Sequence, residues 1–149
     1  MRLFKIFARR PSIDHPVLGR LELRRGKRGP YWMHDTYNED EVALSLQTTG
    51  ERPPTVAQVA FYERIVGDQD SIFSKVADHL VPKYEAYLRR HQFPANWSEA
   101  LALVGVGIPL DGTEANPWDV TFRLKTENLG YLFTCYFERG FVVGVSVDT

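Results

Sequence analysis

The chain has 149 residues, of which 44% are hydrophobic and 25% are charged, and its net charge is −1. This length and composition predict one globular domain and exclude a disordered chain. There is one cysteine, Cys135, no apolar run near the roughly 18 residues that a membrane-spanning helix needs, and no secretory signal pattern at the start, so we expect a cytoplasmic protein that does not enter a membrane.

Charge is divided unevenly along the chain. Residues 1–29 hold nine Lys and Arg against two acids, a net charge of +7, whereas the remaining 120 residues hold nine against seventeen, a net charge of −8. Such asymmetry is typical of a surface for an anionic partner. It also fits a basic hairpin that packs beside acidic helices in one fold, which is the interpretation we favour.

The first part of the chain has the pattern of a strand meander. Residues 1–13 read as a basic N-terminal tail, followed by a single domain over residues 14–149. Alternating apolar residues predict strands over 17–23, 31–37 and 41–47. The first two strands are separated by "RRGKRGP", whose two glycines and proline are typical of a turn.

A change of period at Thr55 predicts the first of two helices. Thr55 is a suitable N-cap residue, and Gln58 occupies the capping-box position three residues later. The apolar pattern continues to about Val66, and Gly67 is expected to end the helix.

The second helix is expected to begin at about Ser71 and to end near His91. Its apolar side chains recur at spacings of mostly three and four residues, which places them on one face. Pro82 lies inside this pattern. Because proline removes a backbone hydrogen bond and clashes with the carbonyl of Asp78, we expect a kink or a break there.

The last third of the chain returns to strand patterns. Apolar or alternating segments predict four strands, over 100–110, 118–125, 131–138 and 141–148. The short connections between these segments favour antiparallel pairing. The sequence therefore predicts an α+β domain, in the order β-β-β-α-α-β-β-β-β, with a mostly antiparallel sheet and two helices packed on one face.

No pattern of residues indicates a metal or cofactor site. The four histidines (His15, His34, His79 and His91) have no zinc-ligand spacing, and "GVG" at 105–107 is too short for a nucleotide-binding loop. Cys135 alternates with aromatic residues on a predicted strand, where a buried thiol is a poor nucleophile. We therefore expect no metal and no cofactor, and we favour a protein without enzymatic activity.

Two pairs of neighbouring residues combine a carboxylate with an imidazole, at Asp14-His15 and at His34-Asp35. A carboxylate can orient a histidine and raise its basicity. The alternation of a strand, however, points His34 and Asp35 to opposite faces. A small enzyme or ligand-binding domain that uses His15 and His34 remains the alternative hypothesis.

The basic hairpin over residues 20–28 is the candidate partner-binding site. Its predicted contact residues are Arg20, Arg24, Arg25, Lys27, Arg28, Tyr31 and Trp32. A protein partner could pair with these cations, and a nucleic acid could use them for phosphate contacts with the two aromatic rings for stacking. The near-neutral whole-chain charge argues against nucleic acid. A charged turn that only protects a sheet edge has the same composition.

Three segments have a recognisable combination of residues, "HPVLG" at 15–19, "VALSL" at 42–46 and "VVGVSVD" at 142–148, with Trp32, Trp118, Val120 and Phe122 between them. Together they resemble a group of uncharacterised bacterial domains. Members of this group open with an HPVFG-like segment and end with a GVSID-like strand, and here Leu18 replaces the usual aromatic residue. The resemblance implies a small α+β domain but carries no activity, and its likeness to bacterial immunity proteins is one of fold and size.

These observations predict a non-enzymatic binding module, of a kind that could include immunity-type proteins that bind and neutralise a protein partner. They do not identify the partner or any substrate, and they leave the oligomeric state open.

Overall fold

The computed structural model describes residues 10–36, 41–89, 92–126 and 129–149. Within these ranges the chain has an α+β fold, as predicted, with no helix that is long and apolar enough to cross a membrane. In chain order the elements are β1 (Ser12–His15), β2 (Gly19–Gly26), β3 (Gly29–His34), β4 (Ala43–Gln47), α1 (Val56–Gly67), α2 (Gln69–Tyr87), a 3-10 turn (Trp97–Glu99), β5 (Leu101–Ile108), β6 (Trp118–Leu124), β7 (Leu132–Glu138) and β8 (Phe141–Asp148).

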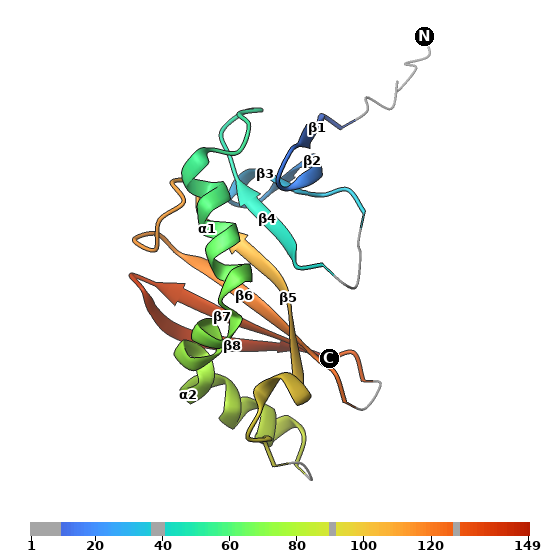
Figure 1. Cartoon of the computed structure of the whole chain (residues 1–149), viewed down its shortest axis with the longest axis vertical. Helices are drawn as coiled ribbons and strands as arrows, with labels where there is room; N and C mark the ends of the chain where they lie inside the picture. The colour runs from blue at the N-terminus through green and yellow to red at the C-terminus, as the bar shows by residue number, and fades with distance from the viewer. Residues whose placement is uncertain (1–9, 37–40, 90–91, 127–128) are drawn as a thin grey trace.

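The strands form one sheet in which each strand lies beside its neighbours in the sequence (Figure 1). Every neighbouring pair is antiparallel except β4 and β5, which are parallel. A parallel pair needs a crossover connection, because the chain must return to the same end of the sheet, and α1 and α2 form that crossover. The sheet is therefore mostly antiparallel, as predicted, and consists of two meanders joined by one parallel pair.

Four strands precede the helices, so the predicted order with three strands in this part is wrong. The additional strand is β1, in which Ser12 pairs with Glu22 of β2 and His15 pairs with Gly19. It begins within the segment that the sequence predicts as a tail. Its alternation was missed because the strand is only four residues long and ends just before Pro16, at a turn.

Alternate side chains of the strands point to opposite faces of the sheet. One set packs with side chains of both helices in a single apolar core. The ring of Phe61 in α1 lies 5.0 Å from that of Trp118 in β6, and the ring of Tyr84 in α2 lies 6.3 Å from that of Phe133 in β7. Figure 1 shows α1 and α2 in front of these strands. Asp119 belongs to the other set, which points to the opposite face of the sheet.

The second helix continues through Pro82, so of the expected kink or break, the break does not occur. Pro82 and Asp78 both lie on the exposed side of α2. The carbonyl that loses its helical partner can therefore bond to water, which lowers the cost of the proline. The helix ends at Tyr87, and His91 lies outside the described residues.

The first helix begins with the predicted capping box. The backbone N–H of Gln58 donates to Oγ1 of Thr55, and the N–H of Thr55 donates to Oε1 of Gln58. The side-chain amide of Gln58 also donates to two strand ends, at 2.7 Å to the carbonyl of Gln47 and at 3.1 Å to that of Pro109. This buried side chain therefore ties the start of α1 to the ends of both parallel strands.

Two loops lie near the start of α1, one that leads into this helix and one that follows β5. The indole N–H of Trp32 and the hydroxyl of Thr48 both donate to the carbonyl of Arg52, in the loop that leads to α1. In the loop after β5, a Cβ on Gly112 would lie 2.6 Å from the backbone of Ala57, and φ at Gly112 is +66°. Only glycine allows this loop to approach the helix so closely.

We expect Gln58→Ala to lower the free energy of unfolding by about 2–4 kcal/mol, because it leaves two carbonyls at the strand ends without a donor. Gln58→Glu keeps an acceptor for the N–H of Thr55 but turns a second oxygen toward those carbonyls, so it should destabilise the fold at least as much. Urea denaturation measures both changes. Gln92→Ala, at an exposed glutamine, is the matched control, and an equal effect there would contradict this role of Gln58.

Candidate functional site

The β2–β3 hairpin ends in a tight turn, as the sequence predicts. Arg25 pairs with Pro30 and Gly26 with Gly29, so Lys27 and Arg28 occupy the two turn positions. Glycine at position 29 allows the left-handed φ of +99° that this turn requires. We call residues 25–28 the hairpin tip.

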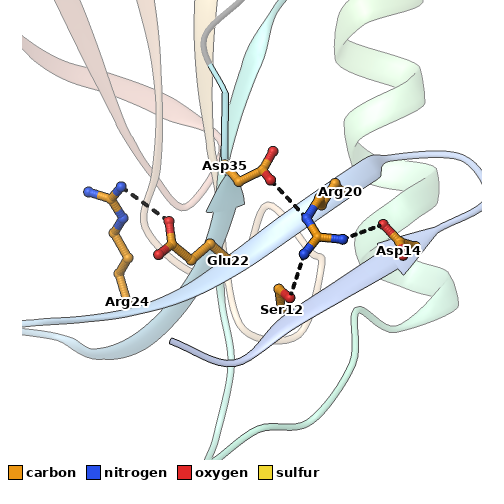
Figure 2. Close-up of polar contacts among 6 residues, drawn as sticks. All are labelled: Ser12, Asp14, Arg20, Glu22, Arg24 and Asp35. Atoms are coloured by element: carbon orange, nitrogen blue, oxygen red, sulfur yellow. Dashed lines mark hydrogen bonds and ion pairs between the residues drawn. The ribbon is translucent and has the colours of Figure 1, made fainter. Parts of the chain in front are cut away.

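Two arginines of the predicted site are engaged within the fold. Nε of Arg20 lies 2.9 Å from a carboxylate oxygen of Asp35, and its Nη1 lies 3.3 Å from Asp14. Figure 2 shows this guanidinium between the two carboxylates, with Ser12 as a further partner. It connects β1 to the residue that follows β3, and so has a structural role.

Arg24 also has an internal partner. Its Nη2 lies 3.3 Å from Oε2 of Glu22 (Figure 2), and the other oxygen of Glu22 lies 3.7 Å from Nη1 of Arg10. The side chain of Arg24 is 38% exposed. A partner could reach it, but it already shares a carboxylate with Arg10.

The cations of the hairpin tip differ from Arg20 and Arg24. Arg25, Lys27 and Arg28 are all exposed. Within the part of the chain that the structure describes, no carboxylate lies within 4 Å of any of the three. The tip therefore presents three positive charges that form no salt bridge with the described residues, although the charge of Arg28 acts on the carboxylate of Asp119 from a longer distance.

The two aromatic residues of the predicted site, Tyr31 and Trp32, lie on opposite faces of the sheet. Trp32 is buried in the core with 1% of its surface exposed, and its indole N–H donates to Arg52. It cannot contact a partner without unfolding the sheet. Tyr31 points to the opposite face and lines a pocket beside the hairpin tip.

This pocket has a volume of about 230 Å³ and lies where the hairpin tip meets the middle of the sheet. Its lining comes from the hairpin, from both parallel strands and from the start of β6. The residues are Gly26, Lys27, Arg28, Gly29, Tyr31, Ser45, Gln47, Gly107, Ile108, Pro117, Trp118 and Asp119.

Asp119 is the one acid among the described residues of the pocket. It pairs with Gly107 across β5 and β6, and a Cβ on Gly107 would lie 2.7 Å from a carboxylate oxygen of Asp119. The carboxylate therefore lies against the backbone of β5, in space that the glycine leaves. Burial raises the pKa of Asp119 above its usual range, and the positive charge of Arg28 opposes part of that shift.

The sequence alone did not single out Asp119. Its alternation with Trp118 and Val120 placed it on the side away from the core, but any surface carboxylate has that pattern. Its position opposite Gly107 depends on the register between β5 and β6, which includes a bulge between Leu103 and Gly105. The glycines at 105 and 107 were the available signal, since they leave space above a strand.

The histidines of the alternative hypothesis have structural partners. Nδ1 of His15 accepts from the backbone N–H groups of Val17 and Leu18, and so closes the β1–β2 turn. Nδ1 of His34 accepts from the N–H of Leu44, which leaves its Nε2 to donate to the carbonyl of Leu18 at 2.8 Å. The two rings therefore lie near the same turn, but both bond to backbone.

The carboxylates next to these histidines pair with Arg20. Asp14 and Asp35 therefore lie on either side of one guanidinium. The described ranges contain no group of three or more His, Cys, Asp or Glu side chains that could hold a metal ion.

Comparison with protein-family models, with curated proteins and with solved structures finds no match. The resemblance to the group with HPVFG-like and GVSID-like segments therefore stays a prediction from the residues.

The raised pKa of Asp119 predicts a pH-dependent effect of Asp119→Asn. An acid whose pKa is higher in the folded than in the unfolded state loses stability as pH rises from its unfolded pKa through its folded pKa. The asparagine variant should therefore be more stable than the wild type at pH 7, by about 1.4 kcal/mol per unit of pKa difference, and equal to it below the unfolded pKa. Denaturation at several pH values tests this, and a variant less stable at pH 7 would contradict it.

Cys135 should react with iodoacetamide only when the protein unfolds. Its side chain is fully buried, and burial, followed by the charge of Asp119, raises the pKa of its thiol to about 12. Labelling at pH 7.5 measured by mass spectrometry should be negligible in buffer and complete in 6 M guanidinium chloride. Rapid labelling in buffer would show that β7 opens readily.

Proposed function

We propose that this protein is a non-enzymatic binding module that holds an acidic surface of a protein partner with its hairpin tip. The observation that carries the proposal is the contrast within one hairpin. Arg20 and Arg24 pair with carboxylates of the same chain, whereas Arg25, Lys27 and Arg28 are exposed without such a pair among the described residues.

The position of these cations supports binding to a folded surface. They stand on a two-residue turn between paired strands, so the backbone that carries them is ordered. A rigid set of like charges attracts an oppositely charged surface and speeds its association. Tyr31 and the pocket beside the tip add apolar surface, which a stable protein interface also needs.

Two further features favour a binding module over an enzyme. In both candidate catalytic histidines, Nδ1 accepts a hydrogen bond from a backbone N–H group, and the carboxylates beside these histidines pair with Arg20. The resemblance to small bacterial domains of immunity-protein size favours a role in which the bound partner is inactivated. A cytoplasmic site of action is part of this proposal.

The test is capture of a partner with three forms of the full chain. The first is the wild type, the second carries Arg25→Glu, Lys27→Glu and Arg28→Glu, and the third carries Lys83→Glu, Arg89→Glu and Arg139→Glu. The third set also reverses three exposed cations, two of them in and after α2 and one in the β7–β8 turn.

We expect one stoichiometric protein to bind the wild type and the control variant. The hairpin variant should bind it at least about tenfold more weakly, because three attractive charges become repulsive. Affinity should also fall as salt is added. Equal binding by all three forms would refute a role for the hairpin tip, and capture of nucleic acid in place of protein would refute the protein partner.

A further inference from the structure

The pocket beside the hairpin tip has the chemistry of a site for a cationic side chain. We propose that it receives one lysine or arginine side chain of the protein partner, which pairs with the carboxylate of Asp119. This inference rests on the proposed function and adds what the partner must present.

The walls of the pocket suit a long side chain with an apolar stem. Tyr31 and Pro117 contribute ring surface, and the volume of about 230 Å³ can hold one such side chain. Lys and Arg bury their methylene groups along apolar surface while the charged end reaches a polar partner. The ring of Tyr31 could also stack with a guanidinium group.

The floor of the pocket supplies the negative charge. Asp119 lies against Gly107, and among the described residues no side-chain or backbone group hydrogen-bonds its carboxylate. A partly buried carboxylate without a donor gains strongly from a charge-assisted hydrogen bond. An anion bound at this depth would instead meet the like charge of Asp119.

The cations at the rim set the context of the bound side chain. Lys27 and Arg28 line the same pocket. They weaken, without abolishing, the binding of an isolated basic side chain. A lysine or arginine that is flanked by acidic residues can pair with Asp119, while the flanking carboxylates pair with the cations of the hairpin tip. The pocket therefore selects an alternating acidic and basic surface.

The test uses small probes with the full chain, so that it does not depend on capturing the partner. N-acetyl-arginine amide and N-acetyl-lysine amide are titrated into the isotope-labelled protein, with N-acetyl-citrulline amide as the uncharged analogue of the first. Amide resonances of Ser45, Gly107 and Asp119 report on the pocket by NMR. We expect saturable shifts with a cationic probe and at least about tenfold weaker binding of the citrulline probe.

Two carboxylate variants and one set of cation variants complete the test. Asp119→Asn should abolish binding of the cationic probes, whereas Asp78→Asn, at an exposed aspartate of α2, should leave it unchanged. Probe affinity should rise with pH as Asp119 ionises. Arg25→Glu and Arg139→Glu, at two exposed cations that do not line the pocket, should each leave probe binding unchanged.

These outcomes separate the two proposals. Unchanged probe binding by Asp119→Asn, no saturable shift with either cationic probe, or preferential binding of N-acetyl-glutamate amide would each overturn the pocket assignment. None of these three results would change the outcome of the capture experiment, so the proposed function would stand without the pocket assignment. Conversely, normal binding of the partner by the hairpin variant would refute the proposed function, whether or not the probes bind the pocket.

Discussion

The side-chain amide of Gln58 joins the start of one helix to the ends of two paired strands. It bonds to Thr55 at the start of α1, to Gln47 at the end of β4 and to Pro109 just after β5. The sheet consists of two antiparallel meanders, and β4 and β5 are the one described pair that connects them. A buried amide with three satisfied bonds at the end of this pair fixes how the two halves of the sheet are aligned.

That alignment also forms the candidate site. The hairpin tip and Tyr31 belong to the first meander, and Asp119 belongs to the second. The pocket lies across the junction of β4 and β5, so its two walls are held in place by the same parallel pair that Gln58 secures. In physical terms, a core hydrogen bond on one side of the sheet positions charged groups on the other side.

Local patterns in the sequence predicted the elements better than their connections. The capping box at Thr55 and the turn after Arg25 involve residues close in sequence, and both were predicted correctly. The parallel pairing of β4 with β5 was not predicted, since it depends on contacts made by segments separated by two helices. Strand β1 was missed because four residues give too short an alternation.

Only part of the site was predicted, because its tertiary contacts, like the parallel pairing, are not evident from local patterns in the sequence. The basic residues were evident from composition, but composition does not separate Arg20, which pairs with Asp14 and Asp35, from Arg28, which is exposed. Trp32 was assigned to the partner surface, although in the structure it is buried in the core. Asp119 acquired its setting from the register with β5, which is a tertiary property.

The most direct measurement of the central claim is hydrogen exchange of the backbone amides with and without the captured partner. We expect the partner to slow exchange at the hairpin tip, at the end of β4 and at the start of β6, and to leave exchange in α2 and β8 unchanged. These regions lie far apart in the sequence, so joint protection would locate the interface across the junction. Protection confined to α2 and β8 would show that the protein binds its partner through a different surface.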